Sequence, residues 1–458
     1  MSRLFRGLIA VIGLVVLLPA CAGGAAPATV AATPVPATVA PATAVPATVA
    51  PATAAGGGAG QLITLTILSN FTPDVARGKV LNSLIDEFNK EQAGKIKMVS
   101  DTNPDWPGLQ QKIRSMIAAG APPDVFIYNY NPTDLTREKS GTLMDWKPYL
   151  DADPQWKATL RDENLAALTI NGQIMGIPSD QAPVMFYYHK DLFEKAGIKS
   201  FPTTWDEFFK DADALKASGV SPIALMTADD AWHAMNAFTM LAVSAGGEDV
   251  FAPTQSLNSP AVVKAAGELK RFFQNYTTRD AVGANYAVSS RNFISKKAAM
   301  IIDGPWLVSS IQTDVQNPCN VGVAPSPTYG DGKAPEGFIV SDSMNAWAAA
   351  KQPTKEREQA VVEWMKFYTS EASAKQMSLQ GDFPQAVKLT YTDQDKASTN
   401  CNMAQVLDIS SKAPFLVVSA VRYITTPAQA QLPSLLESLA LGKITPEDFA
   451  AKLQAANQ

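Results

Sequence analysis

Leu62-Ile63-Thr64-Leu65-Thr66-Ile67-Leu68 is the stretch that decides the fold, because its length and its β-branched residues predict a strand. Apolar residues at helical spacing follow from Val80 to Phe88, and a second short strand is predicted over 96–99. A second helix over 109–117 ends before Gly120, and 125–128 is predicted as a third strand. This βαβαβ order predicts a parallel sheet with right-handed crossovers, and therefore an α/β fold.

Polar and aromatic residues follow each of these three predicted strands, at 69–71, 101–103 and 128–131. In open parallel sheets, ligands bind beyond the carboxyl ends of the strands. The three ends therefore predict a small-molecule site, with Asn70, Tyr128 and Asn131 as candidate ligand contacts.

The first 60 residues predict export and tethering. Arg3 and Arg6 precede an apolar run over 7–18 that is too short to span a membrane, and Cys21 closes the leader. We predict a signal peptide over 1–20 and a lipidated Cys21, since the segment resembles a bacterial lipobox. A simple cleaved leader is the alternative. Residues 21–60 are rich in Pro, Ala and Thr, which predicts an extended tether with the lipid anchor as its only membrane contact.

The remaining chain, about 400 residues, is long enough for two domains. A net charge of −5 without a basic run argues against nucleic-acid binding. Cys319 and Cys401 form an even pair in an exported chain, which predicts a disulfide, with two buried thiols as the alternative.

Motifs for common enzyme chemistries are missing from the sequence. It has no HExxH pair, no G-x-S-x-G elbow and no phosphate-binding loop. We therefore expect no catalytic residues, no metal and no cofactor. With 43 acidic residues, a pair of carboxylates that cleaves glycosidic bonds stays open as an alternative.

Several motifs resemble those of family 1 extracellular solute-binding proteins, the group of sugar- and maltodextrin-binding components of ABC importers. The most specific covers 293–306 and ends in Gly304-Pro305-Trp306. Others follow the family's order, so that the resemblance spans 62–455: Pro123-Asp124-Val125-Phe126, Gly176-Ile177-Pro178 with Asp180, Phe201-Pro202-Thr203-Thr204-Trp205, Gly246-Gly247 and Gly381-Asp382-Phe383-Pro384. One departure lies at 340–345, where the family usually has a Gly-rich turn.

The resemblance implies a periplasmic-binding-protein-like fold of type II, with two discontinuous Rossmann-like lobes and a hinge. Lobe 1 would comprise 61–180 plus 328–381, and lobe 2 would comprise 181–327 plus 382–458. The chain would pass between the lobes near 177–182, 324–327 and 381–386. Both cysteines would then fall in the second lobe.

The resemblance also implies a sugar site between the lobes. Sugars stack their C–H faces on aromatic rings, and their hydroxyls need polar partners. The candidates besides the strand ends are Trp306, Trp232, Asp180 and Phe383. None of these residues is basic, which favours a neutral sugar over a phosphorylated one. A polyamine stays open, because five aspartates lie in or near these segments: Asp180, Asp229, Asp230, Asp303 and Asp382.

We therefore expect a monomeric, lipid-anchored binding component on the extracytoplasmic face of the cell membrane. It would capture a neutral carbohydrate, close around it and deliver it to the permease subunits of an ABC importer. A tethered carbohydrate-active enzyme and a sensory-only ligand-binding module are the alternatives.

Overall fold

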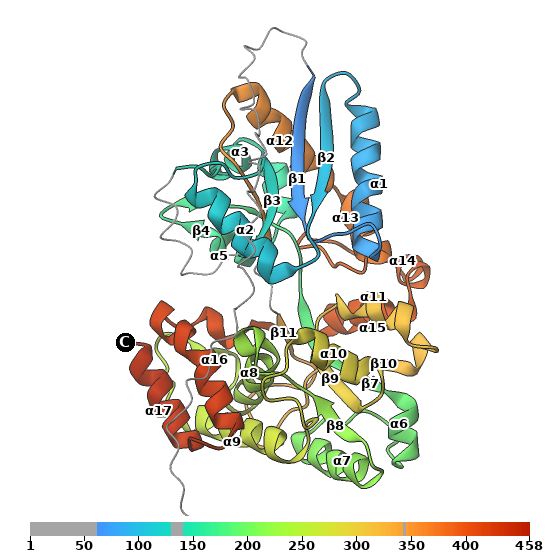
Figure 1. Ribbon diagram of the computed structural model, residues 1–458, viewed down its shortest axis with the longest axis vertical. Helices are drawn as coiled ribbons and strands as arrows, with labels where there is room; N and C mark the ends of the chain where they lie inside the picture. Colours follow the sequence, from blue (N-terminus) through green and yellow to red (C-terminus); the bar gives the residue numbers. More distant parts are fainter. Residues whose placement is uncertain (1–61, 130–140, 342–344) are drawn as a thin grey trace, which may run out of the picture. The chain divides into compact units, whose positions relative to one another are not determined.

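A computed structural model of the chain describes residues 62–129, 141–341 and 345–458 (Figure 1). Cys21, the predicted tether and Asn131 lie outside these ranges. The described chain is built on two separate α/β sheets, one with five strands and one with six. We call the residues around the five-stranded sheet the first lobe and those around the six-stranded sheet the second lobe. No helix in the described ranges is long and apolar enough to cross a membrane.

The first lobe contains the predicted βαβαβ unit. Its strands follow the order β2-β1-β3-β12-β6. β1 pairs in parallel with both β2 and β3, which confirms the predicted parallel arrangement, and β12 pairs antiparallel with β3 and β6. The strands are β1 (Ile63–Ser69), β2 (Ile96–Thr102), β3 (Val125–Asn129), β6 (Ile177–Pro178) and β12 (Asn345–Ala349), with a separate hairpin of β4 (Thr169–Ile170) and β5 (Gln173–Ile174).

Helices pack on this sheet through apolar faces at helical spacing. In α1 (Ala76–Glu91), Val80, Leu81, Leu84 and Phe88 are all buried. The other helices of this lobe are α2 (Trp106–Ala118), α3 (Lys147–Ala152), α4 (Pro154–Thr159), α5 (Asp162–Ala167), α12 (Lys355–Tyr368) and α13 (Glu371–Gln380). The short helix α14 (Asp393–Ser398) contacts both α13 of this lobe and α15 of the second.

The second lobe has the strand order β13-β11-β7-β9-β8, and β10 also pairs with β7. Its strands are β7 (Pro183–His189), β8 (Ser221–Ala224), β9 (Ala298–Asp303), β10 (Val321–Ala324), β11 (Ile339–Ser341) and β13 (Leu416–Val418). Its helices are α6 (Lys190–Lys195), α7 (Trp205–Ala217), α8 (Trp232–Gly246), α9 (Pro260–Asn275), α10 (Tyr286–Ile294), α11 (Leu307–Asp314), α15 (Cys401–Lys412), α16 (Thr426–Ala440) and α17 (Pro446–Ala456). Short 3-10 turns occur at η2 (Asp229–Ala231), η3 (Glu248–Phe251), η4 (Pro318–Asn320) and η5 (Ala420–Arg422).

The chain passes between the two sheets three times, and not every passage lies where it was predicted. The first passage joins β6 to β7, within the predicted 177–182 region or directly after it. The second was predicted at 324–327, but β11, which ends at Ser341, pairs with β7 and β13 of the second sheet, and β12, which begins at Asn345, pairs with β3 and β6 of the first. Residues 328–341 therefore belong to the second lobe, because their apolar side chains pack in its core. In the third passage, Phe383 and Val387 still pack in the first core, and the second lobe resumes with α15.

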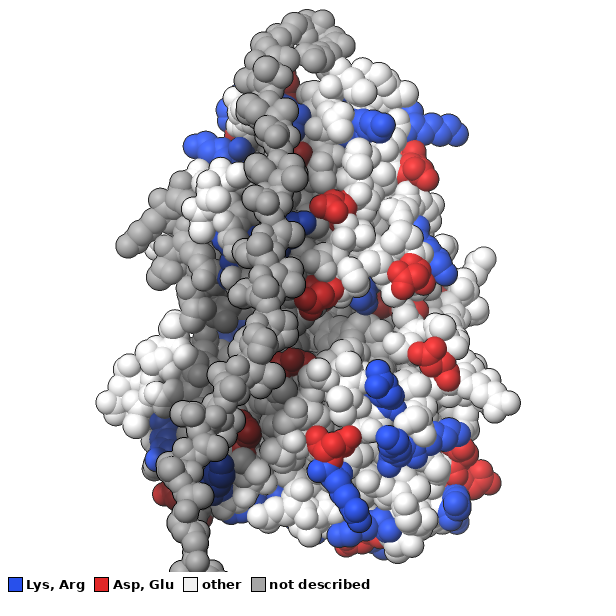
Figure 2. All heavy atoms as spheres, in the orientation of Figure 1, with Lys and Arg blue, Asp and Glu red and all other residues white. Residues whose placement is uncertain are grey.

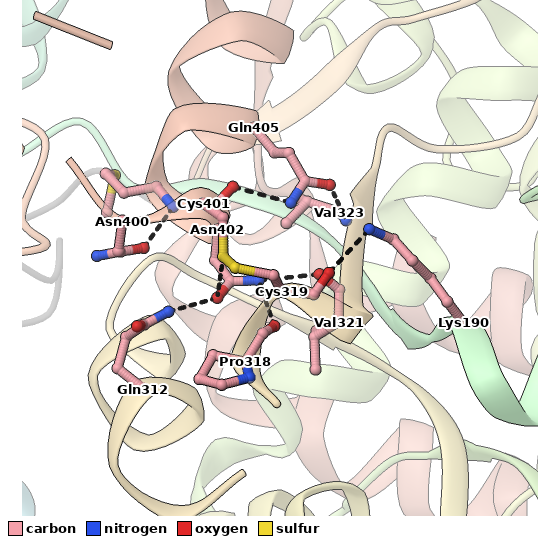
Figure 3. Close-up of a disulfide and its surroundings, with 11 residues drawn as sticks. Lys190, Gln312, Pro318, Cys319, Val321, Val323, Asn400, Cys401, Asn402 and Gln405 are labelled. Atoms are coloured by element: carbon pink, nitrogen blue, oxygen red, sulfur yellow. Dashed lines mark hydrogen bonds between the residues drawn. A yellow bond between two sulfur atoms is a disulfide. The ribbon is translucent and has the colours of Figure 1, made fainter. Parts of the chain in front are cut away.

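A disulfide joins Cys319 in η4 to Cys401 at the start of α15, as the sequence predicts (Figure 3). The two Cα atoms are 5.7 Å apart and 82 residues separate them in sequence. Hydrogen bonds reinforce the junction, because Asn402 Nδ2 donates to the carbonyls of Pro318 and Val321 at 3.2 and 2.9 Å. Gln405 Oε1 accepts the Val323 N–H at 3.1 Å. The bridge therefore fixes the start of α15 to β10 within the second lobe.

Charged side chains of both signs are interspersed over the described part of the face in Figure 2. Several form pairs at the surface, such as Lys296 with Asp191 and Lys264 with Asp331. Exposed pairs of this kind contribute about 0–1 kcal/mol each, so the lobes are stabilised chiefly by their apolar cores.

Candidate ligand-binding site

Three partly exposed aromatic rings meet in the second lobe. Trp232 is the first residue of α8, Tyr286 is the first residue of α10, and Trp306 directly precedes α11. The ring centroids of Trp232 and Trp306 are 5.6 Å apart at an interplanar angle of 69°, and those of Trp232 and Tyr286 are 5.7 Å apart. We call these three rings the aromatic corner. The structure thus brings together the two predicted tryptophans and adds a tyrosine that the sequence reasoning missed.

A strained turn positions two of the rings. Asp229, Asp230 and Ala231 all have positive φ, at 50°, 59° and 54°, which is costly for residues other than glycine. The side chain of Asp229 accepts the backbone N–H of Tyr286 at 2.8 Å. This bond ties the turn before Trp232 to the start of α10, so the strained turn fixes both rings at once.

The third ring depends on a glycine. A Cβ atom at Gly304 would lie 2.3 Å from Cη2 of Trp306, well inside the distance that real Cβ contacts show. Only glycine therefore lets the indole fold back over this turn. The Gly304 N–H also donates to Oδ1 of Asp303 at 2.7 Å, which fixes the end of β9 against the turn.

Asp303 and His233 lie buried beneath the aromatic corner, and both are 0% exposed. His233 Nε2 is 3.9 Å from Asp303 Oδ2. Burial raises the pKa of Asp303 well above its usual range, although the Gly304 N–H, Trp306 and Tyr286 oppose this rise. Burial lowers the pKa of His233 to about 3.

The first lobe contributes residues that follow β1. Asn70 has a buried Oδ1 without a hydrogen-bond partner among the described residues. Phe71 is buried against Trp347 and Phe383, with ring centroids 5.8 and 4.9 Å away. The guanidinium of Arg77, at the start of α1, lies 5.3 Å from the Phe71 centroid.

Arg77 electrostatically connects the two lobes. Burial lowers the pKa of Arg77, and Tyr286, Asp180 and Asp382 act in the opposite direction. Tyr286 belongs to the second lobe, and the two aspartates belong to the first and third passages. Arg77 forms no hydrogen bond or ion pair at contact distance within the described ranges, and its Nε is buried without a partner. Arg77 is a basic residue near these groups that the sequence analysis did not single out.

The first and third passages each bury a carboxylate. Asp180 is 2% exposed, and its Oδ1 accepts the Ser179 hydroxyl at 2.5 Å. Asp382 has a φ of 52° and accepts hydrogen bonds from Asn400 Nδ2 at 2.6 Å and from Ser309 Oγ at 3.2 Å. Burial raises the pKa of Asp382, while these two bonds and the charge of Arg77 oppose the rise.

Two of the predicted contacts are packed in the first core. Tyr128 is 2% exposed and Phe383 is 6% exposed, so each makes core contacts in this arrangement. No local signal in the sequence separates such rings from those of the aromatic corner, because both kinds follow strands or lie in passages. Within the described ranges, no group of three or more His, Cys, Asp or Glu side chains could hold a metal ion.

Comparisons with known proteins agree with this architecture. The family model described as "Bacterial extracellular solute-binding protein" matches residues 72–375. A putative binding protein of Brucella abortus is 26% identical over 367 residues, covering 76% of this chain and 83% of the relative. The maltodextrin-binding protein MdxE of Bacillus subtilis is 26% identical over 306 residues, covering 64% of this chain and 67% of the relative.

Solved structures show the same fold. A structure from work on xylan utilization by the thermophilic bacterium Caldanaerobius polysaccharolyticus is 25% identical, with a TM-score of 0.73, and the match covers 86% of this chain and 99% of that one. A chitin oligosaccharide binding protein is 24% identical with the same TM-score, and the match covers 86% of this chain and 98% of that one. These matches extend over both lobes.

Proposed function

This chain belongs to the family of bacterial extracellular solute-binding proteins, and from that membership we propose that it captures a neutral carbohydrate for an ABC importer. The aromatic corner is the observation that carries the proposal. Three rings from separate elements remain partly exposed and lie within 6 Å of one another in the pairs given above. Such rings suit the apolar faces of sugar rings, and the names of several relatives include maltodextrin, diacetylchitobiose and lactose.

The polar groups near the corner support a neutral ligand. Arg77 offers donors, but the carboxylates of Asp180 and Asp382 act on it and offset its charge. Burial keeps the Asp303 carboxyl biased toward its neutral form, because it raises the pKa of that group. A sugar phosphate would meet the two carboxylates that already offset the charge of Arg77, and a polyamine would lack the charge of Asp303. The hydroxyl groups of a neutral sugar can accept hydrogen bonds from Arg77 and donate hydrogen bonds to the two carboxylates.

Ligand capture would operate through the two lobes. A ligand that contacts the aromatic corner of the second lobe and Arg77 and Asn70 of the first favours the closed arrangement by its differential affinity. The closed lobes would then be recognised by the permease subunits, and the protein would act as a monomer without cofactor, metal or catalytic residues. A signal peptide over 1–20 and a lipidated Cys21 would hold it at the extracytoplasmic face of the membrane.

The first test is a thermal-shift screen of the purified protein against maltotriose, chitobiose, xylotriose, lactose, glycerol 3-phosphate and spermidine. A true ligand stabilises by ~2.7 kcal/mol at a hundredfold excess over its Kd. We expect at least one neutral saccharide to raise the Tm and to be recovered uncleaved after prolonged incubation. A shift with spermidine or glycerol 3-phosphate alone would refute the neutral-carbohydrate proposal. Recovery of a cleaved saccharide would indicate that the protein is a carbohydrate-active enzyme instead.

Anchoring has its own test. Cys21→Ser should move the protein from the membrane fraction to the medium, because a lipidated cysteine is the proposed anchor. Replacement of the neighbouring Ala22 by Ser is the matched control and should leave the protein in the membrane fraction. Equal release of both variants would contradict the lipoprotein proposal.

A further inference from the structure

His233 and Asp303 form a buried pair that direct ligand contact does not use. His233 is the second residue of α8, and Asp303 is the last residue of β9. Both side chains are 0% exposed, and Nε2 of the histidine lies 3.9 Å from Oδ2 of the aspartate. Neither atom has a hydrogen-bond partner within the described ranges. The separation of 3.9 Å is too long for a hydrogen bond, so a charge on either buried group would lack a close partner, which is costly unless both groups are neutral.

The other atoms of the pair are already engaged. His233 Nδ1 shares a hydrogen bond with Ser289 Oγ at 3.1 Å, and Asp303 Oδ1 accepts the Gly304 N–H at 2.7 Å. If Nδ1 carries the imidazole proton and donates to Ser289, then Nε2 presents a lone pair toward Asp303. A carboxylic acid proton on Oδ2 would complement that lone pair. The neutral acid and the neutral imidazole therefore form a matched pair.

We propose that Asp303 stays protonated beside a neutral His233 and that this neutral pair positions the aromatic corner for ligand. The inference rests on the proposed function. Asp303 immediately precedes the turn that carries Trp306. The His233 ring lies 4.0 Å from the ring of Trp232 and 6.0 Å from that of Tyr286, measured between centroids. Each ring of the corner thus adjoins one member of the pair, which makes both members positioning residues.

Within the described ranges, the groups that act on the pKa of Asp303 include no cation. Tyr286 from α10 and Tyr187 from β7 are the other titratable groups that face Asp303, and the pKa of each is raised by burial first and by Asp303 as well. Arg77 lowers the pKa of Tyr286, and Asp382 raises the pKa of Tyr187. Burial also accounts for the neutral pair, because it raises the pKa of Asp303 and lowers that of His233 to about 3. Loss of the proton would leave a buried carboxylate beneath the rings whose Oδ2 has no hydrogen-bond donor within the described ranges.

Ligand binding should be coupled to this proton. A ligand that covers the three rings removes the remaining water above the pair, and dehydration disfavours the ionised acid. The pKa of Asp303 is then higher in the complex than in the free protein. Affinity should be constant below the free-state pKa and should fall above it, by about tenfold for each unit that separates the two states.

The test combines two measurements on the purified protein between pH 5.5 and 9.5. The first is tryptophan fluorescence without ligand, since Trp232 and Trp306 adjoin the pair. The second is the Kd for the saccharide among maltotriose, chitobiose and xylotriose that gives the largest thermal shift. For the wild type, we expect a fluorescence titration and a Kd that rises at alkaline pH. Asp303→Asn should abolish both, and Asp191→Asn, which alters an exposed carboxylate of the same lobe, should preserve both.

A second variant keeps the proposal testable if Asp303→Asn does not fold. Tyr286→Phe removes a hydroxyl that lowers the pKa of Asp303, so the fluorescence midpoint should move to higher pH. A Kd that is unchanged across this pH range, a pH dependence that survives in Asp303→Asn, or an unmoved midpoint in Tyr286→Phe would each overturn the inference. If none of the three saccharides binds but the fluorescence titration depends on Asp303, the carbohydrate proposal fails while the neutral pair stands.

Discussion

At the scale of single residues, binding depends on which aromatic rings stay partly exposed. Trp146, Trp205, Trp347 and Trp364 are each 0% exposed and fill the cores. Trp232 and Trp306 escape this burial because a strained turn and a glycine hold them at the ends of secondary-structure elements. The local backbone, rather than the residue type, therefore separates a binding ring from a core ring.

Trp306→Ala should weaken saccharide binding while leaving the fold intact. Losing an aromatic stacking surface removes about 1–3 kcal/mol, which corresponds to a Kd roughly 5- to 150-fold higher. Isothermal titration calorimetry would measure the change. Trp106→Ala is the matched control, because Trp106 is also partly buried but packs on the first core. Equal affinity in Trp306→Ala and the wild type would contradict the aromatic corner as the ligand platform.

Gly304→Ala tests the same ring without removing it. The new Cβ would lie 2.3 Å from the Trp306 ring and would push the indole out of position, at a cost of about 1–3 kcal/mol in overpacking. We expect weaker binding together with changed tryptophan fluorescence. Gly330→Ala serves as the control, since a Cβ there meets nothing within 4 Å. If the two variants bound equally well, the proposed role of Gly304 would be wrong.

The sequence alone could identify part of this site. Trp306 lies in a specific motif, and the Asp229-Asp230-Ala231-Trp232 segment marks a helix start. Tyr286 and Arg77 carry no such signal: the tyrosine begins an ordinary short helix, and the arginine lies in the first turn of an amphipathic one. Their importance arises from contacts between segments far apart in sequence, such as the bond from Tyr286 to Asp229. Local patterns do not encode these contacts.

At the scale of elements, α15 links the disulfide to the third passage. Its first residue is Cys401, and its N-cap residue Asn400 both caps the helix through Met403 and donates to Asp382. Ser309 on α11 donates to the same carboxylate. The disulfide therefore fixes the start of a helix whose cap holds a buried hinge residue.

Replacing both cysteines by serine should destabilise the protein. Closing an 82-residue loop stabilises by ~4 kcal/mol in the chain-entropy model, so the double variant should unfold at lower urea concentration. Wild-type protein measured with a reductant should show the same loss, whereas the reductant should not affect the double variant. Equal unfolding midpoints for the oxidised wild type and the double variant would contradict a stabilising bridge.

Elements with a strong periodic signal were predictable, and short ones were not. The strand predicted over 62–68 occurs as Ile63–Ser69, and the helical spacing from Val80 to Phe88 falls within α1 (Ala76–Glu91). β11 has only three residues, and its partners β7 and β13 are more than 70 residues away in sequence along either direction. Its place in the second sheet depends on this distant pairing, which is why the second passage was placed too early.

At the scale of the whole molecule, the buried pair should shape the pH dependence of stability. The folded pKa of His233, about 3, lies below its ordinary 6.5, so the unfolded chain takes up the proton first as the pH falls. Stability from this group is complete above pH 6.5 and is lost down to pH 3. The folded pKa of Asp303 lies above its ordinary 3.8, so the stability it contributes is complete below that value and is lost as the pH rises toward the folded pKa.

These opposite slopes predict a distinct result for Asp303→Asn. In the wild type the two slopes oppose each other between about pH 4 and 6.5, so the gain in stability from His233 is offset by the loss from Asp303 as the pH rises. In the variant, the free energy of unfolding should no longer fall at alkaline pH, because the Asp303 contribution is gone. The loss of stability from His233 should then appear in full as the pH drops from 6.5. Urea denaturation at half-unit intervals from pH 4 to 9 would measure this. A variant profile parallel to that of the wild type would contradict the assignment.

The charge of Arg77 interacts with groups of both lobes, and replacing this residue should therefore change stability and binding. It lies in the first lobe, yet its pKa responds to Tyr286 of the second lobe and to the carboxylates of two passages. Arg77→Met should remove the cation that lowers the pKa of Asp382, so that pKa should rise further. A carboxyl with a raised folded pKa costs stability as the pH rises, so the variant should be less stable than the wild type at pH 8, by about 1–3 kcal/mol, and closer to it at pH 4.

The matched variant Arg77→Lys keeps the charge and should follow the pH profile of the wild type more closely than Arg77→Met does. Arg114→Met removes an exposed arginine of α2 and should change neither stability nor binding. Saccharide affinity should fall in Arg77→Met even at pH 4, because the guanidinium donors are lost along with the charge. If Arg77→Met lowered stability equally at both pH values and left affinity unchanged, Arg77 would be a packing residue of α1 and not the group that joins the hinge carboxylates to the ligand.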